Sequence, residues 1–244
     1  MGVDVPRTVR AALADRPVEG RVCLEAGAGV GNATAGLLEA GASRVYAVTN
    51  DAEHAAAVRE RVGRAHPDRL VVVEADLRAT PLATDSVELV TAHGLCNVLD
   101  PPALDRVAAE LSRVAAPDAH LVVDDYAPPP AEAAVSRLFA LENATAQLVD
   151  GRPLLTFYPA DLLAGVFAGH GWQFERCETL LDPVPWTAAH LTAHANEVRE
   201  RAAALPSALG DSLEAMADDL VDDIGSERAG TMYSLAFRRA DGDG

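Results

Sequence analysis

The stretch VCLEAGAGVGNAT, residues 22–34, decides the fold of this chain. An apolar run leads into Glu25, and a helical pattern without proline extends from Asn32 to Ala40. Between them lie three glycines at alternate positions, Gly27, Gly29 and Gly31. Glycine lets the backbone adopt positive φ and approach a ligand closely, and a helix start leaves N–H groups unpaired. The stretch therefore predicts a strand, a glycine turn and a helix that together can hold a ligand.

Further strand patterns follow at regular intervals, separated by helical patterns. They lie at residues 43–51, 70–74, 87–92 and 121–124. Alternating strands and helices are typical of a parallel sheet with crossover helices. The helix predicted at 101–115 is the best defined, because Asp100 can cap it and two prolines suit its first turn. We therefore predict an α/β fold with a parallel sheet over residues 21–126.

The order and spacing of these segments resemble those of class I S-adenosylmethionine-dependent methyltransferases. Residues 25–31 match the E-x-G-x-G-x-G motif of that family, and they fit the dinucleotide-binding pattern G-x-G-x-x-G less well. The segment LSRVAAPDAHLVV is similar to the family's L-x-R-V-L-K-P-G-G-x-L-V-V, with Asp118 and Ala119 in place of the two glycines. The resemblance implies a Rossmann-like, doubly wound, seven-stranded sheet. Such a sheet is mostly parallel with an antiparallel last strand, and here it would carry helical additions.

The resemblance also implies a site for S-adenosylmethionine at the carboxyl ends of the strands. Glu25 would lie near the methionine part of this cofactor, and the three glycines would let the cofactor pass close to the backbone. Asp76 would accept a hydrogen bond from the adenine amino group, and the Leu77 backbone N–H would bind a ring nitrogen. The position that usually holds the ribose with an acid is occupied by Thr49, followed by Asn50 and Asp51. We favour Asn50 for the ribose, because Asp51 also suits the cap of the next helix.

Candidate residues for the acceptor side follow the fourth and fifth strands. His93 stands where the family places groups that face the sulfonium and the acceptor, and a histidine can act as a general base. We predict that His93, Tyr126 and Tyr158 face one pocket beside the methyl group. The alternative for Tyr158 is that it packs the following helix onto the sheet. The segment HGLCNV resembles F-G-L-R-N-V of quinone-biosynthesis C-methyltransferases, with Cys96 in place of arginine, which favours a small-molecule acceptor.

The remaining segments have no assigned task in binding the cofactor. We treat residues 1–244 as a single domain in which 127–170 provide acceptor-side helices. Residues 187–224 are predicted to form two helices, joined near Pro206 and inserted before the last strand. This insertion is interpreted as a cap over the acceptor pocket, as a contact in a homodimer, or as a solvated hairpin that covers one sheet edge.

The charge of the chain is strongly negative. Its formal net charge is −17, and its basic residues are all arginine. Such a surface resembles those of proteins from extreme halophiles such as haloarchaea, because molar salt shortens the screening length to ~3 Å. A GC-rich genome would explain the missing lysine but not the acid excess. The acidity also disfavours nucleic acid as a partner, since phosphate binding needs a basic face.

The sequence also indicates where the protein resides. No stretch approaches the ~18 apolar residues of a membrane span, and the first residues lack the apolar core of a signal peptide. The three cysteines are far apart and odd in number, so we expect reduced thiols and a cytoplasmic protein. No cluster of metal ligands is visible, and no metal is predicted.

Together these patterns predict an enzyme that transfers a methyl group from S-adenosylmethionine to a small molecule and releases S-adenosylhomocysteine. Two alternatives remain open. The acceptor could be RNA or protein, or the chain could be a cofactor-binding regulatory subunit without turnover.

Overall fold

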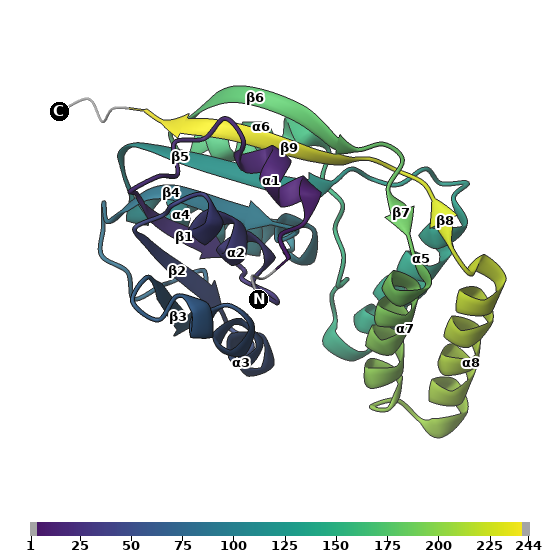
Figure 1. Cartoon of the computed structure of the whole chain (residues 1–244). Coiled ribbons are helices and arrows are strands. Elements are labelled where there is room, and N and C mark those ends of the chain that lie inside the picture. The colour runs from purple at the N-terminus through teal and green to yellow at the C-terminus, as the bar shows by residue number, and fades with distance from the viewer. Residues whose placement is uncertain (1–3, 241–244) are drawn as a thin grey trace.

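The computed structural model describes residues 4–240, and its centre is a seven-stranded sheet in the order β3-β2-β1-β4-β5-β9-β6 (Figure 1). The strands span Val22–Ala26 (β1), Arg44–Thr49 (β2), Leu70–Glu74 (β3), Val87–His93 (β4), Ala115–Tyr126 (β5), Trp172–Leu181 (β6) and Met232–Arg239 (β9). The first five are parallel, and β9 runs antiparallel to both β5 and β6. The predicted mostly parallel sheet with an antiparallel last strand is confirmed.

Helices cover both faces of this sheet. They are α1 (Arg7–Leu13), α2 (Asn32–Glu39), α3 (Ala52–Arg61), α4 (Pro101–Val114) and α6 (Ala160–Gly169). The apolar residues of α1 and α2 pack with Val45 and Leu89 on one face, and those of α4 and α6 pack with Val90 and Leu121 on the other. Helix α4 begins as predicted, because the Asp100 carboxylate accepts a hydrogen bond from the Ala103 N–H at 2.8 Å. The carboxyl ends of β1, β4 and β5 therefore meet between two layers of helices.

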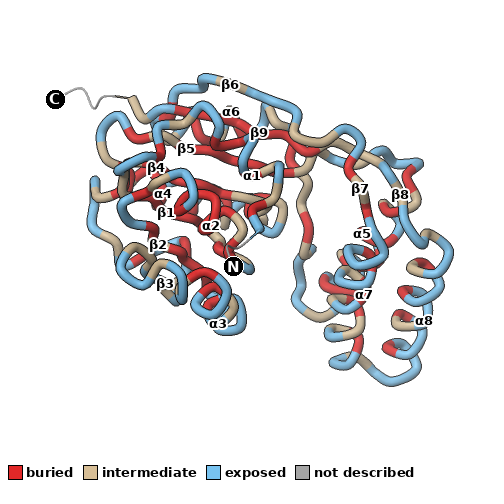
Figure 2. The backbone as a smooth tube through the Cα atoms, viewed as in Figure 1, coloured by how far each residue is buried: buried red, intermediate tan, exposed pale blue. Residues whose placement is uncertain are grey.

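A second helical unit lies beside the sheet, at the right of Figure 1. It contains α5 (Ala134–Asp150), α7 (Ala188–Ala202), α8 (Ser207–Ile224) and the short strands β7 (Pro185–Trp186) and β8 (Glu227–Arg228). These elements share a hydrophobic core of their own, with buried faces that point toward one another (Figure 2). Segment 127–170 is thus divided, since α5 joins this three-helix unit while α6 packs on the sheet.

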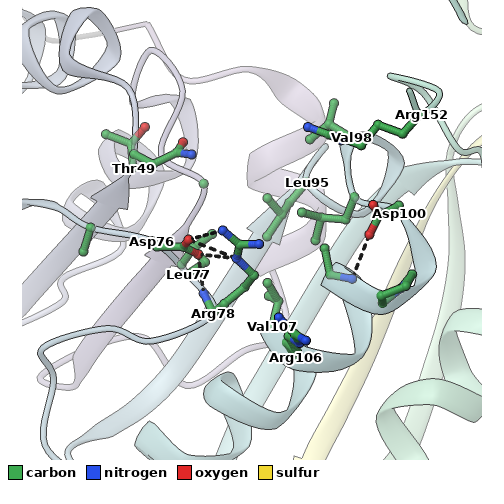
Figure 3. A pocket seen from close by; sticks show the side chains of 16 residues that line it. Thr49, Asp76, Leu77, Arg78, Leu95, Val98, Asp100, Arg106, Val107 and Arg152 are labelled. Carbon is green, nitrogen blue, oxygen red and sulfur yellow. Dashed lines mark hydrogen bonds and ion pairs between the residues drawn. The ribbon is translucent and has the colours of Figure 1, made fainter. Parts of the chain in front are cut away.

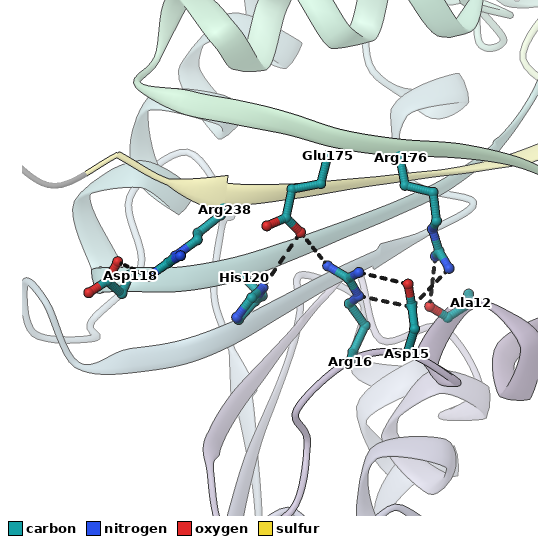
Figure 4. A network of polar contacts seen from close by, with 8 residues as sticks. All are labelled: Ala12, Asp15, Arg16, Asp118, His120, Glu175, Arg176 and Arg238. Carbon is teal, nitrogen blue, oxygen red and sulfur yellow. Dashed lines mark hydrogen bonds and ion pairs between the residues drawn. The ribbon is translucent and has the colours of Figure 1, made fainter.

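Ion pairs connect the end of the N-terminal helical segment to strand β6 (Figure 4). The Arg16 guanidinium contacts Asp15 at 2.7 Å and Glu175 of β6 at 2.6 Å. Arg176 returns to Asp15 at 2.8 Å and also donates to the Ala12 carbonyl. The side chains of Arg16 and Arg176 are largely buried, so this network is more than a pair of surface charges. It joins the segment after α1 to the strand at the sheet edge.

Among residues 4–240, no helix is both long and apolar enough to cross a membrane.

Candidate functional site

The glycine stretch forms a tight turn between β1 and α2. Gly27, Gly29 and Gly31 adopt φ of 76°, 48° and 83°, a region that residues with a Cβ seldom occupy. A Cβ at Gly27 would meet the Leu95 side chain at 2.8 Å, whereas a Cβ at Gly29 would meet no atom within 4 Å. Gly27 therefore permits close packing, while Gly29 borders open space that a ligand can use.

Glu25 is buried beneath this turn. Its carboxylate accepts a hydrogen bond from the Thr34 hydroxyl in α2. Burial raises the pKa of Glu25 to about 7, although the Thr34 hydrogen bond and the nearby His93 oppose that rise. In this structure Glu25 thus holds the first turn of α2 through Thr34, and its predicted contact with the methionine part of a cofactor stays a prediction.

A cavity of about 410 Å³ opens beside the turn, at the carboxyl ends of β1, β2 and β3 (Figure 3). Four of the residues predicted to bind the cofactor line it together, namely Gly27, Asn50, Asp76 and Leu77. Thr49 lines it as well. Asp51 does not, because its carboxylate caps α3 by accepting the N–H groups of Glu53 and His54 at 2.7 and 2.9 Å. Glu25, Gly29 and Gly31 are not among the lining residues.

Three arginines also line this cavity, which the sequence alone did not suggest. Arg78 pairs with the Asp76 carboxylate at 2.5 Å, and this hydrogen bond lowers the pKa of Asp76 to about 2. Arg106 comes from α4 and Arg152 from the loop after α5 (Figure 3). Arg78 directly follows the predicted Asp76-Leu77 pair, whereas no local motif could have found Arg106 and Arg152, which come from distant segments of the chain.

A buried group of ionisable side chains lies where β4 and β5 end. The His93 Nδ1 is 3.0 Å from the Asp124 carboxylate. Burial alone would lower the pKa of His93, but the hydrogen bond and charge of Asp124 raise it. Burial raises the pKa of Asp125 to about 6, while its carboxylate accepts the N–H groups of Tyr126 and Asn97 at 2.8 and 3.1 Å. His93 is therefore held by Asp124 and surrounded by acids.

The three residues expected to share one pocket do not line one cavity. Tyr158 is 5% exposed and packs in the core beneath α6. Its hydroxyl donates to the Leu99 carbonyl at 2.8 Å, so the competing packing interpretation describes Tyr158 better. A sequence pattern could not show that this hydroxyl has an internal partner. His93 and Tyr158 line none of the cavities described here, whereas Tyr126 lines a second cavity.

This second cavity, the aromatic pocket, has a volume of about 210 Å³ and lies where the sheet meets the three-helix unit. Its main lining residues are Asn97, Tyr126, Phe157, Trp186, His190 and His194. Of these, the sequence analysis singled out Tyr126. The structure replaces Tyr158 with Phe157 at the pocket and adds residues of β7 and α7.

Comparison with known proteins agrees with the geometry. Residues 23–118 match a family model described as a methyltransferase domain. Ribosomal RNA small subunit methyltransferase A of Azorhizobium caulinodans is 38% identical over 74 residues, which cover 30% of this chain and 25% of that protein. The chain thus spans about a quarter of the length of this curated relative.

Solved structures share the fold over nearly the whole chain. A putative sarcosine dimethylglycine methyltransferase from Galdieria sulphuraria has a TM-score of 0.61 at 15% identity, covering 96% of this chain and 84% of that one. Geranyl diphosphate C-methyltransferase from Streptomyces coelicolor, solved with Mg²⁺, geranyl diphosphate and S-adenosyl-L-homocysteine, has a TM-score of 0.62 at 15% identity. It covers 95% of this chain and 76% of its own. At such identities the likeness concerns the fold.

Proposed function

We propose that the chain is a class I S-adenosylmethionine-dependent methyltransferase and that it methylates a small-molecule acceptor, which the methyltransferase-domain match over residues 23–118 and the shared fold support. One observation carries the proposal. Gly27, Asn50, Asp76 and Leu77 were selected from separate motifs, and they line one cavity at the carboxyl ends of parallel strands. The volume of about 410 Å³ lies within the range of small-molecule sites.

The residues present fit S-adenosylmethionine, the cofactor of this family. The Asn50 side chain offers hydrogen bonds to a ribose, and the Asp76 carboxylate, which accepts from Arg78 with both oxygens, would share one of these oxygens with an adenine amino group. The Leu77 backbone and the Leu95 side chain line the space that an adenine ring would use. Open space above Gly29 leaves room for the rest of the molecule.

The cofactor supplies a methyl carbon already activated by a sulfonium, so the protein's task is mainly to position and enclose the reactants. Glu25, Asp124 and Asp125 are buried beside His93. Their negative charge would favour a cation over a neutral group near the strand ends. His93 can hold or accept a proton there, because Asp124 orients its ring.

A small molecule is favoured over RNA by charge. The chain carries a net charge of −17, and an acidic surface opposes binding to phosphates. The ribosomal RNA methyltransferase relative keeps RNA as the second candidate, although its match covers only 30% of this chain. We further propose a cytoplasmic location and adaptation to high salt, on the same charge argument.

The first experiment is calorimetry with S-adenosylhomocysteine at high KCl, where we expect one site per chain. Binding of NAD in its place would overturn the proposal. Incubation with methyl-labelled S-adenosylmethionine, a small-molecule extract and ribosomal RNA would then separate the acceptor classes. Label in RNA alone would favour the second candidate. Binding without transfer to any acceptor would favour a regulatory subunit.

A further inference from the structure

The aromatic pocket is built by parts of the chain that no cofactor motif accounts for. Asn97 follows β4, Tyr126 ends β5, Phe157 precedes α6, Trp186 belongs to β7 and His194 to α7. The pocket lies next to the cofactor cavity along the chain, since Leu95 and Val98 line the larger cavity and Asn97 lines this one. A ligand here would therefore be separated from the cofactor cavity by a single turn of chain.

Rings form the walls of the pocket. The ring centroids of Tyr126 and Trp186 are 5.5 Å apart, and Phe139 packs behind the pocket at 5.1 Å from both Phe157 and Trp186. Such walls suit a flat ligand that can stack or meet them edge-on. An apolar cavity of ~150 Å³ holds one benzene ring, so about 210 Å³ accommodates one or two fused rings.

The pocket offers two atoms that can accept a hydrogen bond from a ligand. His194 Nδ1 lies 2.8 Å from the carboxylate of Glu142, which is 1% exposed. A neutral imidazole whose Nδ1 donates to this carboxylate holds a lone pair on Nε2. Among residues 4–240, the Asn97 side-chain oxygen is buried without a hydrogen-bond partner. Both atoms would be satisfied by a ligand that donates.

The charge of the pocket narrows the ligand further. No arginine lines it, in contrast to the cofactor cavity with Arg78, Arg106 and Arg152. A carboxylate or phosphate would lie there without a cation and near the buried Glu142, at a cost in desolvation. A neutral ring with a hydroxyl group avoids that cost and supplies the donor.

We propose that the aromatic pocket binds the methyl acceptor, a planar aromatic alcohol of one or two rings, and that His194 accepts the hydrogen of its hydroxyl group. The inference rests on the proposed function, because it names the substrate class of that reaction. In transfer, the hydroxyl oxygen forms a bond to the methyl carbon while the carbon–sulfur bond breaks. The pair of electrons of the broken bond stays on sulfur, and the hydroxyl proton passes to His194 Nε2 and then to water. Glu142 is a positioning residue that fixes the ring.

The test compares three ligands that differ at one substituent, namely 2-naphthol, naphthalene and 2-naphthoate, by equilibrium dialysis at high KCl. On the wild type we expect 2-naphthol to bind about tenfold more tightly than naphthalene, the effect of one hydrogen bond. 2-Naphthoate should bind more weakly than both. Equal affinity for 2-naphthol and naphthalene, or preference for 2-naphthoate, would overturn the proposal. This comparison needs no variant and is unaffected by folding defects.

The variant His194→Phe then assigns the hydrogen bond. It should bind naphthalene as the wild type does but lose the preference for 2-naphthol, whereas His170→Phe, in a histidine distant from the pocket, should keep it. If His194→Phe keeps the preference for 2-naphthol over naphthalene, His194 does not accept the hydrogen bond. If the variant does not fold because Glu142 loses its partner, Glu142→Gln combined with His194→Phe removes the buried charge.

Two further measurements connect the pocket to the reaction. With S-adenosylmethionine, mass spectrometry should detect 2-methoxynaphthalene, and its absence would overturn the acceptor assignment. Calorimetry with S-adenosylhomocysteine on the same preparation separates the two claims. If S-adenosylhomocysteine fails to bind while 2-naphthol binds, the proposed function is wrong but the ligand class of the pocket is right.

Discussion

The cofactor cavity and the aromatic pocket are built in opposite ways. The cofactor cavity is lined by short motifs at the ends of parallel strands, and it is charged, with Asp76 and three arginines. The aromatic pocket is lined by rings from separated segments and contains no formally charged lining residue. The geometry of the parallel sheet places the residues of the cofactor cavity. The packing of later helices against the sheet places the residues of the aromatic pocket. The two should therefore respond independently to substitution.

The largest expected effect comes from Gly29→Val. A valine would need the positive φ of Gly29 and would project a branched side chain into the space open to a ligand. We expect S-adenosylhomocysteine affinity to fall at least ~100-fold, with 2-naphthol binding unchanged. Calorimetry and dialysis measure the two. Gly165→Ala, at a glycine with free space and ordinary φ, is the control, and equal loss at both cavities would contradict their independence.

The next effect concerns Glu25 and depends on pH. Burial raises the pKa of Glu25 from 4.5 to about 7, so between these values the folded chain binds a proton that the unfolded chain has released. Stability of the wild type should therefore decrease as pH rises through that window. Glu25→Gln cannot ionise, so it should match the wild type near pH 4 and exceed it by about 3 kcal/mol near pH 8. Urea unfolding at both values measures this, and a pH-independent difference would show that Glu25 stays ionised.

A smaller effect is expected for Asp76→Asn. Because the pKa of Asp76 is about 2, its carboxylate is charged at any working pH, and a charge-assisted hydrogen bond to the adenine amino group would be lost on substitution. We expect S-adenosylhomocysteine to bind about tenfold more weakly. Asp118→Asn is a matched control, since it removes an exposed pairing with Arg238 outside the cavity. Unchanged affinity in Asp76→Asn would show that the adenine does not bind this carboxylate.

Salt should have the smallest effect on ligand affinity in the aromatic pocket. Between ~0.1 M and ~2 M KCl the screening length falls from ~10 Å to below ~3 Å, which relieves the repulsion of a chain with a net charge of −17. We expect the melting temperature to rise by several degrees in thermal unfolding monitored by circular dichroism. Dialysis should show 2-naphthol affinity changed by less than about threefold, because the pocket lining is uncharged. A flat melting temperature would remove the argument for salt adaptation.

The comparison also explains how much the sequence could predict. The mostly parallel sheet with its antiparallel last strand was predicted from motifs in which neighbouring residues share one task, and Asn50 and Asp76, chosen from such motifs, line one cavity. Tyr158 was predicted to face the acceptor, and the sequence could not reveal that its hydroxyl donates to the Leu99 carbonyl, 59 positions away. Trp186 and His194 were missed for a related reason, since only tertiary packing brings β7 and α7 to the end of β5. Sequence periodicity indicates which face of a helix or strand a residue occupies, but not which residues of other elements it contacts.

The position of β9 has a consequence for how the chain acquires its structure. This strand follows the other six strands of the sheet in the chain, yet it lies inside the sheet, hydrogen-bonded to β5 on one side and β6 on the other. Until it emerges, β5 has an open edge and β6 has no neighbour in the sheet, so nascent chains expose strand edges that invite wrong pairing. Contacts between β5 and β9 span more than 100 positions, for example from His120 to Arg238, and such distant pairings slow folding. The sheet is therefore complete only when β9 has been synthesised and has paired with β5 and β6.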